Sequence, residues 1–209
     1  MRRGPTIALP LIAGTLALAL AAVVILTAGN GSSTAPRVSS NAASGFDGAA
    51  LSPAPAAPGF SLTDQAGRRV SLAGYRGRPL ILTFLYSTCG ASCIVIAQQI
   101  RGALDELGHP VPVIIVSADP AADTPAHVRA FLESVSLSGR VEYLSGTPAA
   151  LRAIWRDYRV PPAGAGGAAF GRYATVILLD GRGAERVLFQ EEQLTPEALA
   201  HDIRRLEAG

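Results

Sequence analysis

Residues 79–93, PLILTFLYSTCGASC, decide how this 209-residue chain folds. The run 79–86 is almost continuously apolar, which is typical of a strand buried on both faces. Directly after it come Cys89 and Cys93, the only two cysteines in the chain. Apolar residues then follow at helical spacing: Ile96, Ile100, Ala103, Leu104 and Leu107. A helix is therefore expected to begin near Cys93 or just before it, and to end at Gly108.

Further strands and helices are predicted on either side of this stretch. Residues 60–72, FSLTDQAGRRVSL, contain two short extended pieces joined at 65–67, the signal of a hairpin. Strands are predicted at 111–118, 141–144, 173–179 and 187–189, with a hairpin turn at 181–183. Helices with a threonine N-cap followed by proline are predicted to start at Thr124, Thr147 and Thr195.

The order β-β-β-α-β-α-β-α-β-β-α predicts an α/β sandwich with one central mixed sheet. A strand that runs into a cysteine-bearing helix start, with a terminal hairpin and helix, is the thioredoxin-like arrangement. The folded domain is expected over residues 59–209, which is ample for one hydrophobic core.

The first 28 residues predict a membrane anchor. Arg2 and Arg3 precede an uncharged stretch from 5 to 28, and roughly 20 apolar residues span the hydrocarbon core of a bilayer. A cleavable signal peptide usually has a shorter apolar region, so an uncleaved transmembrane helix is expected at 1–28, with a cleaved signal sequence as the alternative. The positive-inside rule leaves the N-terminus cytoplasmic. The chain is therefore expected to be a single-pass protein of a bacterial cell membrane, with its C-terminal domain on the periplasmic face.

Residues 29–58 are expected to form a flexible linker, because they have no apolar period and are rich in Gly, Ser, Ala and Pro. The formal net charge is only +2, and every one of the basic side chains is arginine. Since no arginine-rich run occurs, nucleic-acid binding is not expected.

The spacing of Cys89 and Cys93 suits chemistry at the sulfurs. Residues four apart in a helical turn share one face, so the sulfurs can form a disulfide or bind one metal ion. The free N–H groups at a helix start stabilise a thiolate. In an exported domain such a pair is bridged, metal-bound or kept reduced. The alternative is a local disulfide that only staples a loop, although so short a loop constrains the unfolded chain little.

The metal chemistry of the pair favours copper over zinc. A closed zinc site needs four ligands, and His109, His127 and His201 are scattered along the sequence, where solvated or capping roles are expected. Monovalent copper is soft and accepts few ligands, so two thiolates form an apt partial site.

Several blocks of the sequence resemble the SCO/SenC family over most of residues 59–207. The matching blocks are FSLTDQAGRRVSL (60–72), RGRPLILTFLYSTCGASC (76–93), VSADPAADTPAHVRAFL (116–132), YRV (158–160) and VILLDGRG (176–183). The resemblance implies a membrane-tethered, thioredoxin-fold protein that assists copper-centre assembly in cytochrome c oxidase. It also implies a copper site made of Cys89, Cys93 and one distant histidine.

The chain departs from the family pattern at that histidine. Counting back eight residues from Asp180 reaches Arg172, with no histidine beside it, and arginine cannot be deprotonated to bind copper. Arg172 would either face the sulfurs and favour thiolates or face solvent. The prolines that usually follow each cysteine are replaced by Gly90 and Ile94. The cis-proline position of general thioredoxins corresponds to Ala174, which favours the SCO branch.

Three functions follow from the resemblance and the cysteine pair. The first is thiol–disulfide exchange, in which Cys89 is the nucleophile and Cys93 resolves the mixed disulfide. The second is a copper(I) metallochaperone that uses the same cysteines. The third and weakest is a thiol peroxidase, since residues 87–90 are similar to glutathione-peroxidase loops. Expected partners are the apo copper-bearing subunit of cytochrome c oxidase or another cuproprotein, and a thiol reductase.

Overall fold

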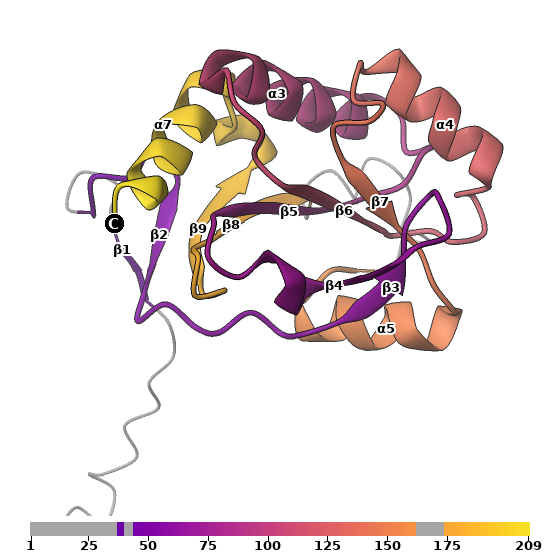
Figure 1. The fold of residues 1–209 in the computed structure, drawn as a ribbon, viewed down its shortest axis with the longest axis horizontal. Helices are drawn as coiled ribbons and strands as arrows, with labels where there is room; N and C mark the ends of the chain where they lie inside the picture. Colours follow the sequence, from indigo (N-terminus) through magenta and orange to yellow (C-terminus); the bar gives the residue numbers. More distant parts are fainter. Residues whose placement is uncertain (1–36, 40–43, 162–173) are drawn as a thin grey trace, which may run out of the picture. The chain divides into compact units, whose positions relative to one another are not determined.

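The computed structural model describes residues 37–39, 44–161 and 174–209, and in this part of the chain seven strands form one mixed sheet (Figure 1). Their order is β1-β2-β9-β8-β5-β6-β7. The bounds are β1 Arg37–Ser39, β2 Ala49–Ser52, β5 Leu80–Leu85, β6 Val113–Ser117, β7 Glu142–Leu144, β8 Thr175–Leu179 and β9 Glu185–Gln190. Strands β5, β6 and β7 run parallel, and the other neighbouring pairs are antiparallel.

The central strand β5 is apolar throughout because both of its faces are covered. All six of its residues are buried. Ile81 and Leu85 point to one core cluster, and Leu80, Leu82 and Phe84 point to the other, as the two-residue period of a strand requires. The first cluster lies under helices α3 (Ala91–Leu107), α4 (Pro125–Ser134) and α7 (Pro196–Glu207).

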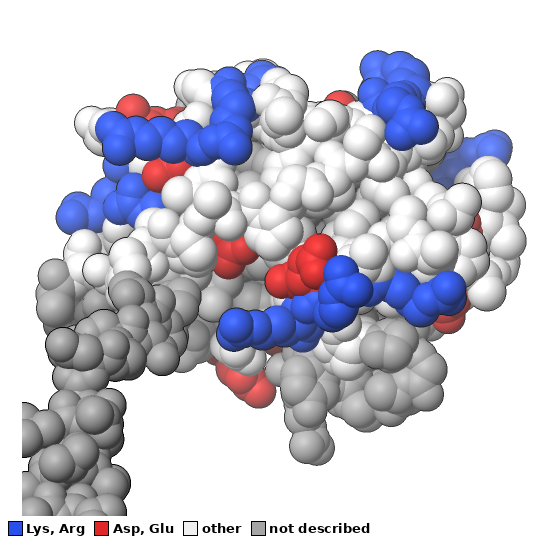
Figure 2. All heavy atoms as spheres, turned by 90° about the horizontal axis from the view of Figure 1, so that it is seen from below, with Lys and Arg blue, Asp and Glu red and all other residues white. Residues whose placement is uncertain are grey.

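The opposite face of the sheet is covered by α5 (Pro148–Asp157) and by the hairpin of β3 (Ser61–Thr63) and β4 (Arg69–Ser71) (Figure 1). A short 3-10 turn at Leu72–Tyr75 leads from β4 towards β5, and another at Glu191–Gln193 leads from β9 towards α7. The predicted α/β sandwich with a central mixed sheet is confirmed. On the face seen in Figure 2, basic and acidic side chains both occur within a mostly neutral surface.

The predicted helix starts are also confirmed. Thr124, Thr147 and Thr195 are N-caps whose side chains each accept a backbone N–H from the third residue of the helix, and a proline follows each of them. The last turn of α3 ends at Gly108, which adopts φ 70°. This left-handed conformation is a common way to end a helix and favours glycine.

The prediction of a flexible linker over residues 29–58 is wrong for the later part of that range. Strand β2 pairs with β9 (Ala49 opposite Leu188, Ala50 opposite Val187), and Phe46 is buried in the core. The domain therefore begins before the predicted boundary at residue 59. The sequence AALS of β2 has no apolar period of its own, because the pairing is supplied by β9, far away in the chain.

The predicted anchor at 1–28 lies outside the described residues. Within the ranges given above, no helix is both long enough and apolar enough to cross a bilayer.

Candidate redox and copper site

Cys89 and Cys93 are joined by a disulfide, with their Cα atoms 5.9 Å apart. Cys93 is the third residue of α3 and is fully buried. Cys89 lies just before the helix and is partly exposed. The structure thus brings together the two predicted site residues, and it makes Cys89 the one that a partner thiol can reach.

A tight turn carries Cys89 from the end of β5 to α3. The Cys89 N–H donates to the carbonyl oxygen of Tyr86 at 3.2 Å. Gly90, the next residue, has φ 82° and ψ −145°. Proline is held near φ −65°, so this turn excludes the proline that the family resemblance leads one to expect at residue 90. Among the described residues, apart from the chain neighbours of Gly90, no atom lies within 4 Å of the position that a Cβ would take there. The backbone conformation therefore favours glycine at this position.

The start of α3 also supplies the electrostatics of the pair. The first four N–H groups of a helix have no partner within it, and the helix dipole places partial positive charge at this end. Reduced cysteines at such a position are stabilised as thiolates. No acidic residue occurs in the first turn of α3 to oppose this effect. The site therefore favours a nucleophilic sulfur once the disulfide is reduced.

A buried carboxylate, Asp123, holds the loop that precedes Cys89. Its Oδ1 accepts the backbone N–H of Ser87 at 2.6 Å. Its Oδ2 accepts the hydroxyls of Ser117 at 2.6 Å and Tyr143 at 2.8 Å. The Trp155 indole N–H donates to the Ser117 carbonyl oxygen at 2.9 Å. One side chain thus fixes the cysteine loop to β6 and β7.

The tyrosine in this network stays a hydrogen-bond donor. Burial, followed by the charge of Asp123 and the hydrogen bond to it, holds the pKa of Tyr143 well above its usual value. Burial also raises the pKa of Tyr86, which borders the cysteine loop, with smaller contributions from Asp119 and Asp123. Sequence reasoning missed the role of Asp123. The sequence block 116–132, which resembles the family pattern and contains Asp123, was the signal from which this role could have been predicted.

Two apolar side chains flank the disulfide at the surface. Ile94 and Val95 follow Cys93 directly and are 40% and 36% exposed, the large exposed hydrophobic residues among those described. The start of α3 therefore carries exposed apolar side chains directly after the buried member of the pair.

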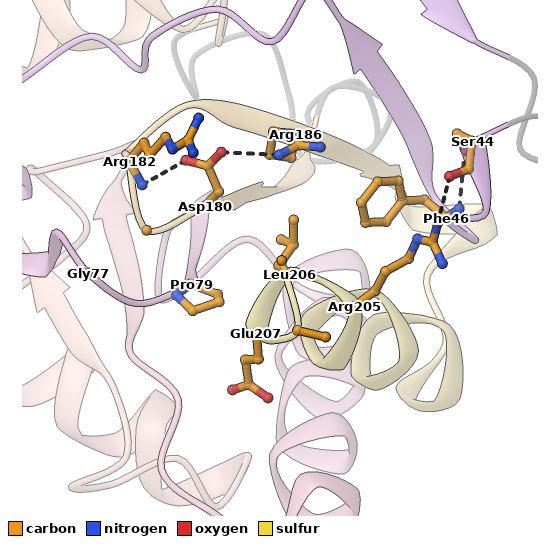
Figure 3. Close-up of a pocket in the computed structure, with 13 residues that line it drawn as sticks. Ser44, Phe46, Gly77, Pro79, Asp180, Arg182, Arg186, Arg205, Leu206 and Glu207 are labelled. Atoms are coloured by element: carbon orange, nitrogen blue, oxygen red, sulfur yellow. Dashed lines mark hydrogen bonds and ion pairs between the residues drawn. The ribbon is translucent and has the colours of Figure 1, made fainter.

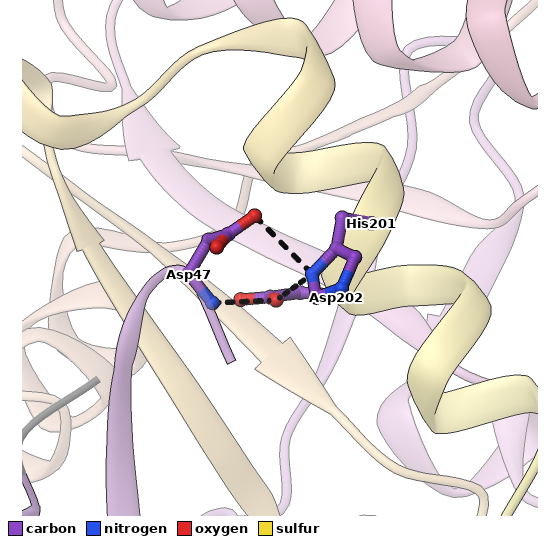
Figure 4. A group of neighbouring side chains, drawn as sticks. All are labelled: Asp47, His201 and Asp202. Atoms are coloured by element: carbon purple, nitrogen blue, oxygen red, sulfur yellow. Dashed lines mark hydrogen bonds and ion pairs between the residues drawn. The ribbon is translucent and has the colours of Figure 1, made fainter. Parts of the chain in front are cut away.

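The predicted solvated or capping histidines fall into two groups. His127 is exposed, and its Nδ1 lies 2.9 Å from the carbonyl oxygen of Ala122. His109 is exposed, with Nε2 3.4 Å from Glu207. His201 instead lies between two carboxylates, Asp47 and Asp202 (Figure 4). Within the described ranges, Asp47, His201 and Asp202 form a group of possible metal ligands whose candidate atoms lie close together. Neither cysteine belongs to this group.

Arg172, the residue at the expected histidine position, lies outside the described residues. Ala174, just before β8, is buried. A cavity of about 710 Å³ lies between the β8–β9 turn and the end of α7 (Figure 3). It is lined by arginines 182, 186 and 205 among others and by neither cysteine, so it is not part of the disulfide site.

Comparison with known proteins places these features in a known group. A model of the SCO1/SenC family matches residues 49–208. The curated protein SenC of Rhodobacter capsulatus is 30% identical over 103 residues, which cover 48% of this chain and 46% of SenC. The chain thus spans about half the length of the curated relative it matches.

Two solved structures resemble the fold. ScoI of Bradyrhizobium japonicum with copper bound is 29% identical, with a TM-score of 0.54, and the match covers 72% of this chain and 99% of that one. The thioredoxin domain of a thiol-disulfide oxidoreductase from Bacteroides vulgatus is 14% identical, with a TM-score of 0.56 and coverage of 73% and 95%. At that identity the likeness shows the fold alone, and the thioredoxin-like prediction is confirmed.

Proposed function

The chain belongs to the SCO1/SenC family, and from this premise we propose that it assists copper-centre assembly in cytochrome c oxidase by thiol–disulfide exchange at Cys89 and Cys93. The Sco family is a family of cytochrome c oxidase assembly proteins. The client is the apo copper-bearing subunit or another cuproprotein, whose cysteines must be reduced before they can bind copper.

One observation carries the proposal: the two cysteines form a disulfide in which one partner is partly exposed and the other is buried. This asymmetry suits thiol–disulfide exchange, because an accessible sulfur can attack the client and a protected one can resolve the intermediate. The positive end of α3 favours the thiolate form of the attacking sulfur. The apolar side chains of Ile94 and Val95 beside the pair offer contact to a protein client.

The exchange proceeds in two displacements. The Cys89 thiolate attacks one sulfur of the client disulfide, that S–S bond breaks, and one client thiolate leaves. The Cys93 thiolate then attacks the Cys89 sulfur, which releases the second client thiolate and forms the Cys89–Cys93 disulfide. The client gains two electrons, and the chain ends in the oxidised form that the structure shows. A thiol reductase partner returns two electrons to the pair.

A second function is favoured by one specific observation, the copper-bound structure of the 29% identical ScoI. In this alternative the reduced pair binds copper(I) through two thiolates, the soft ligands that this ion prefers, and delivers it as cargo. The described residues place no third ligand in a cluster with the cysteines. Two thiolates alone therefore favour exchange as the first proposal and copper(I) delivery as the second.

The proposal includes a membrane location. The paired Arg2 and Arg3 before an uncharged stretch support a single transmembrane helix with the domain outside the cytoplasm. Extraction at alkaline pH should leave the full chain in the membrane fraction and should release a chain that lacks residues 1–28. Release of both chains from the membrane fraction would contradict the proposed transmembrane helix.

The exchange mechanism is tested with single cysteine variants and an oxidised client subunit. Cys93→Ser keeps the attacking sulfur and lacks the resolving one, so it should accumulate a covalent mixed disulfide with the client. Cys89→Ser should form none. Wild type should reduce the client without accumulating the adduct. The adducts are measured by mass spectrometry under non-reducing conditions.

Copper(I) titration of the reduced protein against a competing chelator separates the two functions. If both single variants lose copper(I) binding and Cys93→Ser traps no client, the metallochaperone replaces the exchange proposal. A trapped adduct in Cys89→Ser but not in Cys93→Ser would reverse the assigned roles of the two cysteines.

A further inference from the structure

Asp47, His201 and Asp202 form a cluster outside the disulfide site (Figure 4). His201 and Asp202 are consecutive residues of α7, and Asp47 lies in the segment that leads into β2. The Nδ1 atom of His201 lies 3.0 Å from Oδ1 of Asp202 and 3.2 Å from Oδ2 of Asp47. One imidazole nitrogen thus faces two carboxylate oxygens that come from opposite ends of the sequence.

The buried member of the cluster is held in place by the backbone. The Asp202 side chain is fully buried, whereas the side chains of His201 and Asp47 are about half exposed, at 50% and 54%. The Asp202 Oδ1 accepts the backbone N–H of Asp47 at 2.8 Å, and Oδ2 accepts that of Gly48 at 2.9 Å. These two hydrogen bonds orient the Asp202 carboxylate and hold the Asp47 backbone beside it. Each Asp202 oxygen keeps a second lone pair, because a carboxylate oxygen can accept two hydrogen bonds.

The spacing of the ligand atoms fits a bound ion. Metal–ligand bonds of about 2.0–2.2 Å place neighbouring ligand atoms about 2.8–3.1 Å apart at a right angle and about 3.3–3.6 Å apart at the tetrahedral angle. The two separations from His201 Nδ1 lie within the span of these geometries, and below the tetrahedral value. All three candidate ligand atoms lie within 4.8 Å of one another. The Asp47 side chain is about half exposed and already contacts His201 through Oδ2.

The chemistry of the three side chains selects the kind of ion. Two carboxylates and one imidazole are hard and borderline ligands, which suit divalent first-row transition metals and not the soft copper(I) that thiolates prefer. A protonated His201 bridging the two carboxylates would be a simple ion pair in the same place. A neutral imidazole that carries its proton on Nδ1 would make the same contact as a hydrogen bond. Only the metal interpretation requires Nδ1 of His201 to be an unprotonated ligand.

We propose that Asp47, His201 and Asp202 bind a divalent transition-metal ion such as Zn²⁺, which clamps the segment before β2 to helix α7. The site is independent of Cys89 and Cys93. It is open to solvent on the side of His201 and Asp47, so water completes the coordination. Because binding to the folded state alone stabilises that state, the ion strengthens the attachment of the first strands of the domain.

The test is a Zn²⁺ titration of the full-length protein with its disulfide intact, in competition with a chromophoric chelator. The disulfide keeps the cysteine sulfurs from acting as ligands. Wild type should bind one equivalent, and Asp47→Asn and His201→Gln should each weaken binding by at least about tenfold. His127→Gln removes an exposed histidine elsewhere and should bind as wild type does. Zn²⁺ should raise the Tm of wild type and of His127→Gln, and not of the other two variants.

A second measurement needs no variant. Zn²⁺ should slow the modification of His201 by diethyl pyrocarbonate in wild type and leave that of His127 unchanged. Equal Zn²⁺ affinity in wild type, Asp47→Asn and His201→Gln, or equal protection of both histidines, would overturn the proposal. The double variant Cys89→Ser, Cys93→Ser should keep this Zn²⁺ site, so failure of the exchange function and failure of the metal site give different results.

Discussion

Asp123 joins three parts of the chain through one buried carboxylate. Its partner Ser87 lies 36 residues earlier and Tyr143 lies 20 residues later, and Ser117 belongs to the strand between them. Hydrogen bonds to an ionised group are stronger than neutral ones, and a buried donor that loses its partner is costly. We therefore assign Asp123 as a positioning residue, which acts on Cys89 through the loop that begins at Ser87.

Replacing Asp123 with alanine should lower the free energy of unfolding by about 3 kcal/mol, because three donors lose one buried acceptor. It should also slow exchange at Cys89, since the loop is no longer fixed. The two effects are measured by urea denaturation and by the rate of the reduced protein with a small disulfide. The matched control is Tyr143→Phe, which deletes one donor and should cost about 1 kcal/mol. An exchange rate in Asp123→Ala equal to that of Tyr143→Phe would contradict the positioning role.

Arg172 permits a prediction based on sequence alone. If this residue occupies the histidine position of the family, Arg172→His adds an imidazole to the two thiolates and removes a positive charge. Affinity for divalent copper should then rise at least about tenfold, as expected for a gained ligand. The measurement is competition with a copper(II) chelator, with Arg182→His as the control. Equal affinity in wild type and Arg172→His would mean that counting from Asp180 misplaces the ligand.

The cysteine pair was predictable from sequence, and the residues around it were less so. Cys89 and Cys93 are close in sequence and follow a buried strand, so local periodicity is enough to locate them. Asp123 was missed because its partners are distant along the chain. His201 was expected to be solvated or capping, but Asp47 lies more than 150 residues before it, and no local pattern predicts their contact.

Two hairpins are each closed by an aspartate that accepts backbone N–H groups across the turn. Asp64 accepts from Ala66 and Arg68 between β3 and β4, and Asp180 accepts from Arg182 and Ala184 between β8 and β9. Burial raises the pKa of each carboxyl, but the backbone hydrogen bonds and a nearby arginine outweigh it. The pKa of each is therefore below its usual value.

These shifts predict the direction of acid sensitivity. A folded-state pKa below the unfolded value of about 3.9 means that the stabilisation is present above that pH and is lost as the pH falls through the lower, folded-state pKa. Asp64→Asn and Asp180→Asn should each be less stable than wild type at pH 7 and should lose less stability on acidification. Urea denaturation at a series of pH values below 5 measures this. The two effects should add, because the turns are separate. A double variant with the full acid sensitivity of wild type would contradict the assignment.

Elements with a strong local pattern were predicted closely, and elements that depend on distant partners were not. The strand expected at 79–86 is β5, Leu80–Leu85, and the helix expected near Cys93 begins at Ala91. Strand β2 was not predicted, because its sequence AALS has no β-branched residue and no alternation of apolar and polar residues. Its place is fixed by the free edge of β9 and by the two N–H groups bound to Asp202.

The topology of the whole sheet explains where the chemistry lies. Strands β5 and β6 are parallel neighbours, and their carboxyl ends lead to the cysteine pair and to Asp123 respectively. In open α/β sheets ligands bind outside the carboxyl ends of parallel strands. The Cys89–Cys93 disulfide and the carboxylate of Asp123, which holds its loop, therefore lie at the same end of the parallel strands. Strands β1 and β2 form one lateral edge of the sheet, and the proposed metal cluster lies where the segment before β2 meets α7.

The segment before residue 59 should be needed for the stability of the whole domain. A chain that begins at residue 59 loses β2, the buried ring of Phe46 and the two N–H donors to Asp202. Burial of one phenylalanine contributes about 1.5–3 kcal/mol, and a buried carboxylate deprived of donors costs about 1–3 kcal/mol more. Together these contributions amount to about 2.5–6 kcal/mol. Calorimetry should therefore show a Tm roughly 5–24 °C below that of a chain beginning at residue 44, at about 2–4 °C per kcal/mol. A chain beginning at residue 37 is the control and should differ from the chain beginning at 44 by much less. Equal Tm values for the starts at 44 and 59 would restore the linker boundary at residue 58, since β2 would then contribute nothing to the fold.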